Sequence, residues 1–331
     1  MYSSIINAIE SEVAKPKKMF VTATELLEKG LVNVPKLIDP ILQKVGVVAV
    51  VGSSDTGKSA FLRQLSIAIA TKQKTFLDFP INAKYHKGIY VSSEDDENSI
   101  ASLLYKYNQE AQLEFDQFSG LRYVFDTENL LITLDSMLSE EKVDLIVIDA
   151  FADLYNGQMN EGNKVRGYLN EFNQLAQRHE CLIVFLHHVG KRTEEQAPSK
   201  SNIVGSQSFE AKMRLVLELR KDYHDPNLRH LCIIKGNYLS SEYKKHSYVL
   251  NFDSNMVFHY TGQRVAFEHL VKPSIDKESI QHYKNLKDLL DEGYTQNKAA
   301  EKLGISKGQA SKVLKKHKIE LEVLEQDHEI F

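Results

Sequence analysis

Residues 45–61 read VGVVAVVGSSDTGKSAF, a β-branched apolar run followed by a glycine-rich loop and the start of a helical pattern. The run Val47–Val51 is typical of a central parallel strand buried on both faces. The loop fits G-x-x-x-x-G-K-S/T at every fixed position. Its backbone N–H groups and the helix dipole would favour an anion, so the stretch predicts a phosphate site. The alternative is an ordinary strand–loop–helix connection that fits by chance.

This loop predicts a site for a nucleoside triphosphate and Mg²⁺. Lys58 is expected to contact the β- and γ-phosphates, and the Ser59 hydroxyl is expected to hold the metal. Asp55 places an acid near the phosphates, which would alter nucleotide affinity. The predicted nucleotide-binding residues are Gly52, Ser53, Ser54, Asp55, Thr56, Gly57, Lys58 and Ser59.

A second carboxylate is expected at the end of a later strand. Asp149 closes the apolar run LIVID, where a carboxylate can reach Mg²⁺ through its water shell. An aspartate at a strand end is common in α/β proteins, so the role depends on the P-loop upstream. Ala150 follows, which excludes an Asp-Glu pair at this position. The base that activates water must therefore come from elsewhere.

Glu94 is the predicted general base. It follows the strand pattern GIYVSS and would lie at the carboxyl edge of the sheet, where ligands of such folds bind. Asp95, Asp96 and Glu97 are competing candidates, and a solvated acidic turn is the alternative to all four.

His187 and His188 end the strand pattern CLIVFL at the same edge. A polar side chain there can hydrogen-bond the γ-phosphate and respond to its loss. A metal site is the rival interpretation, although no third ligand of suitable spacing accompanies the pair. A further interpretation is that one of the two histidines is simply packed.

The composition excludes some classes of function. Of the 331 residues, 42% are hydrophobic and 26% charged, as in ordinary globular proteins. The net charge of −4 excludes binding of a polyanion through bulk charge, so any such contact must be local. Cys181 and Cys232 lie in apolar runs without metal-ligand spacing, which predicts a reducing compartment. With no signal peptide or membrane-length apolar run, we predict a cytoplasmic protein without a membrane partner.

Strand and helix patterns alternate through the middle of the chain. They predict an α/β fold with a doubly wound, mostly parallel sheet, closed by a hairpin at residues 247–260. We expect an N-terminal helical segment at 1–34, the core at 35–270, and a small all-α domain with an acidic tail at 271–331. Strands are expected at 88–92, 121–125, 143–150, 181–188, 215–219 and 230–235, and helices at 24–29, 100–107 and 163–178.

Six motifs occur in order along the chain: GSSDTGKS, YVSSED, LIVIDAF, FLHHVGK, GSQSFEAKMR and IIKGNY. Through them, residues 35–262 resemble the RecA-like ATPases of the RepA plasmid-helicase type, relatives of DnaB. The resemblance implies ATP as the nucleotide, Lys58 and Ser59 on its phosphates and metal, and Asp149 on Mg²⁺. It also implies that Glu94 activates water and that His188 is the γ-phosphate sensor.

Members of that family work as rings, usually of six subunits, with ATP sites between neighbours. The resemblance implies that a basic residue of the adjacent subunit completes each site, and Arg214 and Lys235 lie in the regions that supply it. Strand-edge charge is the alternative for both. The segment Lys191–Ile203 has the polar, flexible composition of a loop facing a central channel, or of any surface loop. No aromatic base-stacking residue is identifiable, so contact with single-stranded DNA follows from the resemblance alone.

Residues 295–314, TQNKAAEKLGISKGQASKVL, have the spacing of a DNA-binding helix-turn-helix, preceded by a helix at 280–290. Thr295 is expected to cap the first helix, and Ser306 and Gln309 are expected to form a capping box for the second. Residues 281–318 hold nine lysines and four acids, a local charge of +5. The alternative is a helical oligomerisation module with a solvated basic face. The predicted duplex-DNA contacts are Lys307, Gln309, Ser311, Lys312 and Lys315.

These features favour a DNA-linked ATPase, specifically a hexameric replicative helicase of a plasmid or mobile element. Single-stranded DNA would pass through the ring, and duplex DNA would bind the C-terminal domain. Two alternatives stay open: a DNA-binding regulator switched by ATP, and a recombination or helicase-loading ATPase that does not unwind DNA.

Overall fold

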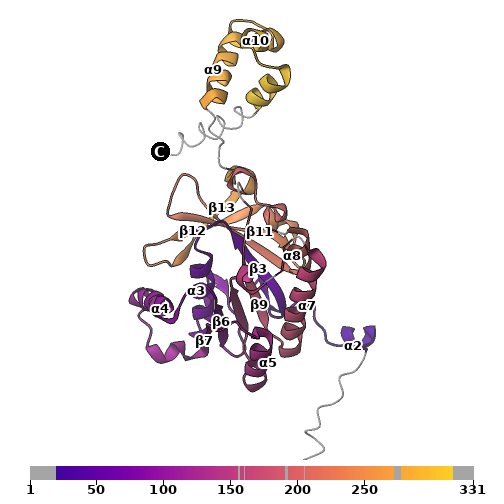
Figure 1. Ribbon diagram of the computed structural model, residues 1–331, viewed down its shortest axis with the longest axis vertical. Coiled ribbons are helices and arrows are strands. Elements are labelled where there is room, and N and C mark those ends of the chain that lie inside the picture. Colours follow the sequence, from indigo (N-terminus) through magenta and orange to yellow (C-terminus); the bar gives the residue numbers. More distant parts are fainter. Residues whose placement is uncertain are drawn as a thin grey trace, which may run out of the picture.

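The computed structural model describes residues 20–155, 157–159, 161–190, 193–204, 206–271 and 277–315. One nine-stranded sheet forms its centre, with the strand order β13-β12-β11-β10-β3-β9-β8-β6-β7 (Figure 1). This architecture confirms the predicted α/β fold and is consistent with a RecA-like P-loop fold. The strands are β3 Gly46–Gly52, β6 Gly88–Ser92, β7 Leu121–Val124, β8 Leu145–Asp149, β9 Leu182–His188, β10 Leu215–Lys221, β11 Leu228–Gly236, β12 His246–Phe252 and β13 Phe258–Ala266.

The P-loop strand β3 lies inside the sheet and pairs in parallel with both β9 and β10. β8, β6 and β7 continue the parallel part. Because parallel strands run in one direction, their carboxyl ends meet at one edge of the sheet. Gly52 is paired with His188 there, and Ser92 is paired with Asp149. The register therefore gathers the residues that the sequence motifs single out.

Helices on the two faces of the sheet divide the core in two. α3 (Lys58–Ala70) packs against one face, where Val48 and Val50 of β3 point. α5 (Leu130–Glu140), α7 (Gly162–His179) and α8 (Ser206–Lys212) pack against the other, where Val47 and Val51 point. Successive residues of a strand point to opposite faces, so the valine run fills both cores. The predicted helix at 163–178 is α7, and the one at 100–107 is part of α4 (Glu97–Ala111).

The described elements include several that the sequence did not predict. α5 buries Leu130, Leu134 and Leu138 at spacings of four residues, a helical signal that its β-branched Ile132 and Thr133 weaken. The unpredicted short elements are the antiparallel pairs β1 (Lys36–Ile38) with β2 (Leu42–Gln43) and β4 (Thr75–Phe76) with β5 (Phe79–Pro80), and α6 (Phe151–Leu154). Two or three residues are too few to show a strand period.

β10 to β13 extend the sheet as antiparallel neighbours. The last two form the predicted hairpin, with its turn between Phe252 and Phe258. Asp253 stabilises that turn, because its Oδ1 accepts hydrogen bonds from the backbone N–H groups of Asn255 and Val257 at 2.9 Å each.

The C-terminal helices have a small core of their own. α9 (Lys277–Asp291), α10 (Gln296–Lys302) and the helical residues 307–315 bury Leu286, Ala299, Ala300 and Ala310. The predicted capping box is present, with Ser306 and Gln309 each donating a backbone N–H to the other's side chain, at 3.0 and 3.2 Å. Thr295 is the N-cap of α10, but the expected side-chain hydrogen bond is absent.

The N-terminal segment is described from residue 20 onward. It contains α2 (Ala23–Leu27), the helix expected at 24–29, while the helix expected around Ile5–Val13 lies outside the described residues. No helix in the described part of the chain has both the length and the apolar character needed to cross a bilayer.

Candidate nucleotide site

The P-loop needs glycine at both fixed positions. Gly57 is the N-cap of α3 with a φ of +90°, a left-handed conformation that favours glycine. A Cβ there would lie 2.8 Å from Cζ of Phe258. A Cβ on Gly52 would collide with the carbonyl oxygen of Leu219 on β10. Close contacts as well as loop conformation therefore require the two glycines.

Lys58 is the first residue of α3 and is buried. Its Nζ donates a hydrogen bond to the carbonyl oxygen of Ser53 at 2.8 Å, which closes the loop on itself. Burial lowers the pKa of Lys58, and the negative charges of Asp149 and Glu94 oppose that shift. The ammonium group thus lies within electrostatic reach of both acids predicted for the site.

Asp149 ends β8, and its carboxylate is buried beside the P-loop. Oδ2 accepts a hydrogen bond from the Tyr90 hydroxyl at 2.6 Å. Oδ1 is buried and has no hydrogen-bond partner within the described chain. Burial raises the pKa of Asp149, while the hydroxyls of Tyr90 and Ser59 oppose the shift. A carboxylate oxygen without a partner near a serine hydroxyl offers the oxygen ligands that Mg²⁺ prefers, so these residues fit the predicted metal.

Two of the four acids after β6 have structural positions at the start of α4. Asp96 is the N-cap of that helix, and its carboxylate accepts the backbone N–H of Ser99 at 2.8 Å. Glu97 is exposed in the first turn, where a negative charge complements the helix dipole.

Glu94 is exposed but lies near the other charged groups of the site. Partial burial and the charge of Asp149 raise its pKa, and Lys58 opposes the shift. A carboxylate with a raised pKa is better suited to accept a proton from water. Asp95 stays a competitor, because its charge also acts on Asp149.

The two histidines at the end of β9 have different surroundings. His187 is buried between Phe151 and Phe209, with ring centroids 5.4 and 4.4 Å away. Its Nε2 lies 3.1 Å from the carbonyl oxygen of Val204, which requires a proton on that nitrogen. Burial lowers the pKa of His187 to about 4, so the ring is neutral. His187 is the packed histidine of the pair.

His188 is half-buried and faces the charged groups of the P-loop region. Burial and the positive charge of Lys58 lower its pKa, and Asp149 opposes the shift. A neutral imidazole at this position can donate or accept a hydrogen bond at a phosphate oxygen.

Arg214 lies at the other edge of the sheet, whereas Lys235 pairs with Val216 of β10 and is level with Ala49, in the middle of β3. The backbone N–H of Arg214 donates to the carbonyl oxygen of Val47, near the start of β3. The P-loop begins five residues further along that strand, roughly 16 Å away at the rise of a β-strand. Arg214 is exposed, whereas the Lys235 Nζ forms an ion pair with Glu210 at 2.9 Å.

The loop after β9 is anchored over residues 193–204. The buried guanidinium of Arg220 donates to the carbonyl oxygens of Gln196 and Thr193, at 2.8 and 2.9 Å. Asn202 and Ile203 are buried as well. Within the segment Lys191–Ile203, whose composition is polar and flexible, Arg220 thus holds part of the backbone in place.

Arg229 on β11 contacts the P-loop, a role that the sequence did not reveal. Its Nε donates to the carbonyl oxygen of Thr56 at 3.2 Å. Its guanidinium also lies over the Phe252 ring, 5.1 Å from the centroid. A cavity of about 370 Å³ adjoins this contact, lined by Asp55, Lys221, Asp222, Tyr223, His224, Pro226 and Arg229.

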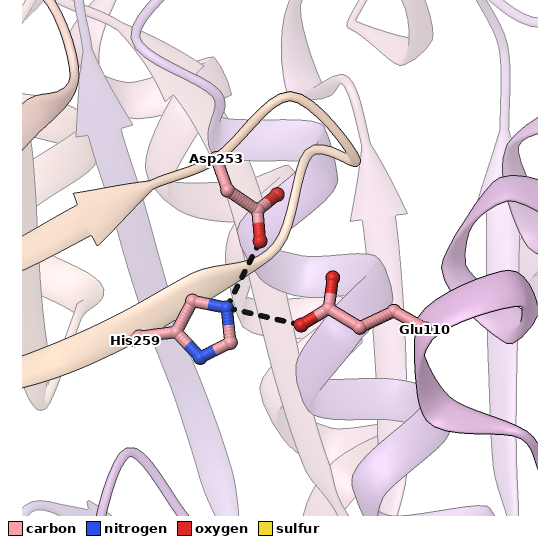
Figure 2. A group of neighbouring side chains, drawn as sticks. All are labelled: Glu110, Asp253 and His259. Carbon is pink, nitrogen blue, oxygen red and sulfur yellow. Dashed lines mark hydrogen bonds and ion pairs between the residues drawn. The ribbon is translucent and has the colours of Figure 1, made fainter.

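The β12–β13 hairpin packs against the P-loop and α3. Gln64 of α3 exchanges two hydrogen bonds with the backbone of Phe258, at 2.8 and 2.9 Å. The same hairpin reaches α4, because His259 on β13 lies between Glu110 of α4 and Asp253 of the turn (Figure 2).

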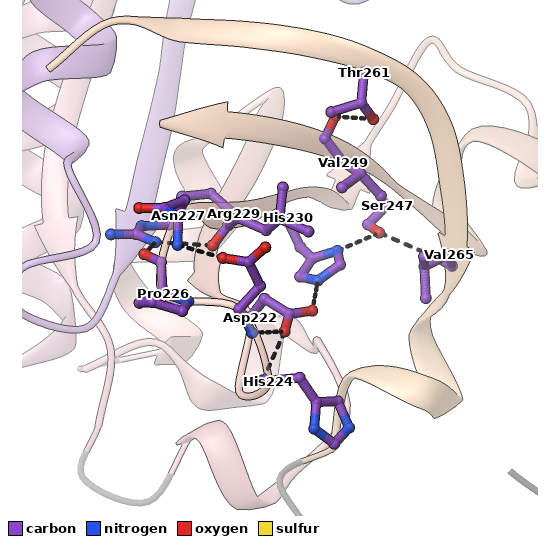
Figure 3. A network of polar contacts seen from close by, with 12 residues as sticks. Asp222, His224, Pro226, Asn227, Arg229, His230, Ser247, Val249, Thr261 and Val265 are labelled. Atoms are coloured by element: carbon purple, nitrogen blue, oxygen red, sulfur yellow. Dashed lines mark hydrogen bonds and ion pairs between the residues drawn. The ribbon is translucent and has the colours of Figure 1, made fainter. Parts of the chain in front are cut away.

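A hydrogen-bonded chain of the half-buried Asp222 and the buried His230 and Ser247 lies nearby (Figure 3). His230 Nε2 lies 2.8 Å from the Asp222 carboxylate, and its Nδ1 lies 3.0 Å from the Ser247 hydroxyl. This acid–histidine–serine arrangement resembles the catalytic triad of a hydrolase. Ser247 has no exposed surface, and its hydroxyl donates to the carbonyl oxygen of Val265 at 3.1 Å. Burial alone would raise the pKa of Asp222, but hydrogen bonds from His230 and two backbone N–H groups hold it at about 2. The chain therefore links β10, β11 and β12 as a structural network.

In the C-terminal unit, the five predicted DNA-binding residues share one helix, 307–315. All five are exposed: Lys307, Gln309, Ser311, Lys312 and Lys315. The opposite side of the same helix contributes Ala310 and Val313 to the small core. Among the described residues, the exposed side of this helix is therefore basic.

The fold and the P-loop define a P-loop nucleoside triphosphatase. Residues 11–194 match the sequence profile of the AAA domain family, and the chain belongs to this family. It is thus an AAA-type ATPase. The matched range includes the P-loop, Asp149 and both histidines, and ends before β10 and the C-terminal helices. Comparison with curated proteins found no match.

Replacing Lys58 by alanine is expected to weaken Mg·ATP binding by roughly ten- to a hundredfold. A hydrogen bond to a charged group contributes about 1.5–3 kcal/mol, and the substitution removes that group from the phosphates. Titration with a fluorescent ATP analogue measures the effect. Lys74→Ala removes an exposed lysine beyond the end of α3 and is the matched control. Unaltered affinity in Lys58→Ala would contradict the assignment.

Proposed function

We propose that this chain is a DNA-linked ATPase that assembles into a ring, as a replicative helicase of the RepA type does. The placement of Arg214 and Lys235 supports this proposal most directly. Arg214 lies at the edge of the sheet opposite the P-loop, and Lys235 lies on β11, two strands away from β3, so we expect each to act on a neighbour's site rather than on its own. A ring, usually a hexamer in such ATPases, supplies a neighbour whose site they can complete.

The proposed hydrolysis uses the residues gathered at the carboxyl edge. The backbone of residues 52–57 and Lys58 hold the phosphates of ATP, and Ser59 and Asp149 hold Mg²⁺. The metal, when bound, neutralises charge on the β- and γ-phosphate oxygens. Glu94 accepts the proton of a water that attacks the γ-phosphorus, and ADP leaves. His188 contacts the γ-phosphate and loses that contact after hydrolysis.

Activity measurements without DNA, with single strands and with duplex test this function. A ring helicase is expected to hydrolyse ATP faster on single strands and to unwind a forked duplex. ATP hydrolysis without unwinding would favour a recombination or helicase-loading ATPase. ATP-dependent binding of one duplex site, with no response to single strands, would favour a regulator. The basic C-terminal unit with its own core makes the regulator the second candidate.

Replacing Lys307 and Lys312 together by alanine is expected to weaken duplex binding while leaving basal ATPase activity unaltered. Each lost phosphate contact contributes about 0.9 to the slope of log affinity against log salt, so the slope should fall by about 1.8. Fluorescence anisotropy over a salt series measures it. The matched control replaces Lys284 and Lys287, two exposed lysines of α9, and removes the same charge. An equal loss of duplex affinity in both variants would show that DNA binding depends on the total positive charge and not on this helix.

A further inference from the structure

Three potential metal ligands from separate elements meet at the outer side of the β12–β13 hairpin. Glu110 lies near the end of α4, Asp253 lies in the hairpin turn, and His259 lies on β13. His259 Nε2 is 3.0 Å from Asp253 Oδ2 and 3.4 Å from Glu110 Oε1. The three candidate ligand atoms all lie within 4.8 Å of one another. Figure 2 shows both carboxylates pointing at the same ring nitrogen.

Other hydrogen bonds orient these carboxylates. Asp253 accepts the backbone N–H groups of Asn255 and Val257 on Oδ1, which leaves Oδ2 facing the histidine. Asn255 also donates from its side chain to Glu110 Oε2 at 3.1 Å, which leaves Oε1 facing the histidine. One residue, Asn255, thus positions both acids. Outer partners that fix ligand orientation in this way are typical of metal sites.

The three groups bring two negative charges together around one imidazole. Two carboxylates converge on one nitrogen, which carries at most one proton. A divalent cation would neutralise both negative charges and use the lone pair of Nε2. In tetrahedral zinc sites the ligands lie about 2.0–2.2 Å from the metal, which places neighbouring ligand atoms roughly 3.3 Å apart. The distances of 3.0 and 3.4 Å lie close to this value.

We propose that Glu110, Asp253 and His259 bind a divalent transition-metal ion, with Zn²⁺ as the best match to one imidazole and two carboxylates. His259 is 48% exposed, so water can occupy the fourth position. The ion would join α4 to the hairpin, two segments whose contact residues Glu110 and Asn255 are 145 positions apart. Phe258 of this hairpin packs against Gly57 of the P-loop. A bound ion would therefore stabilise the hairpin that supports the P-loop.

Equilibrium dialysis of the full-length, tag-free protein against zinc sulfate tests this site, without nucleotide or magnesium. We expect one bound zinc per chain, a rise in Tm with zinc, and a cobalt absorption spectrum of tetrahedral type. His259→Asn and Glu110→Gln should each lose the bound ion. Asn255→Ala should weaken binding by about 10-fold, because it removes the side-chain amide that orients Glu110 and leaves the backbone N–H to Asp253 in place.

Matched substitutions separate this site from other metal-binding residues. His246→Asn and Glu128→Gln replace exposed residues elsewhere and should bind zinc normally. Asp149→Asn should also retain the ion, which would exclude the P-loop region as its location. The cobalt spectrum is recorded on the unmodified protein, so it tests the site even if a variant fails to fold. Absence of stoichiometric zinc binding, or equal affinity in His259→Asn, would overturn the proposal.

Discussion

Glu94→Gln is expected to bind Mg·ATP as the parent protein does and to hydrolyse it about 10²–10⁴ times more slowly. Glutamine keeps the size and polarity of the side chain but cannot accept the proton of the attacking water. Glu94 is the acid after β6 whose charge acts on Lys58, and it has no capping role. Phosphate release at saturating ATP measures the rate, and titration with a fluorescent nucleotide measures the affinity.

The neighbouring acids provide the controls for this experiment. Asp96→Asn should hydrolyse ATP normally, because asparagine also caps a helix N-terminus well. Glu97→Gln removes only an exposed charge in the first turn of α4 and should also be active. Asp95→Asn is the decisive comparison. If Asp95→Asn loses activity and Glu94→Gln keeps it, the base is Asp95.

Much of the fold follows from local sequence pattern. The run Val47–Val51 of β3 is apolar at every position and rich in β-branched residues, a pattern typical of a strand buried on both faces. The strand at residues 88–92 and the hairpin at β12–β13 could be predicted for similar local reasons. α5 was missed because its β-branched residues obscure a helical pattern that its three buried leucines carry. Elements of two or three residues have no period to detect.

The site is less visible in the sequence, because much of it depends on contacts between distant residues. A phosphate loop can be predicted from its own residues, but its support by Arg229 requires β11 to lie beside the loop. The hydrogen bond from Tyr90 to Asp149 likewise depends on the register of β6 and β8. Sequence alternation indicates that His187 and His188 face opposite sides. The packing of Phe151 and Phe209 identifies His187 as the buried one.

The two candidate basic residues for the neighbouring site have different surroundings. Lys235 donates to the carbonyl oxygen of Glu210 at 2.7 Å and forms an ion pair with its carboxylate. Both side chains are mostly buried, so Lys235→Ala would leave Glu210 without its closest partner and lower stability. The Arg214 side chain is exposed and makes no hydrogen bond or ion pair to any residue that the structure describes. In the proposed ring, the Arg214 side chain would therefore be the one available to an adjacent subunit.

Arg214→Ala is expected to fold normally and to lower the rate of ATP hydrolysis by about 10³–10⁵, the range reported for arginine residues that complete phosphoryl-transfer sites. Mixing it with Glu94→Gln subunits should restore part of the activity. In such a mixed ring, some interfaces combine an intact Glu94 with an intact Arg214 from the neighbour. At equal amounts, about a quarter of the interfaces have this combination if subunits assemble at random.

Thermal unfolding and subunit exchange provide the controls for that mixing experiment. Lys235→Ala should lower Tm, whereas Arg214→Ala should leave it unaltered, because only the former removes the closest partner of a mostly buried acid. Exchange between differently labelled subunits must first show that mixed rings form. If mixed rings form and activity does not recover at any ratio, Arg214 does not act across the interface. Recovery with Lys235→Ala alone would assign that function to the lysine, which would then have to leave Glu210 when the ring assembles.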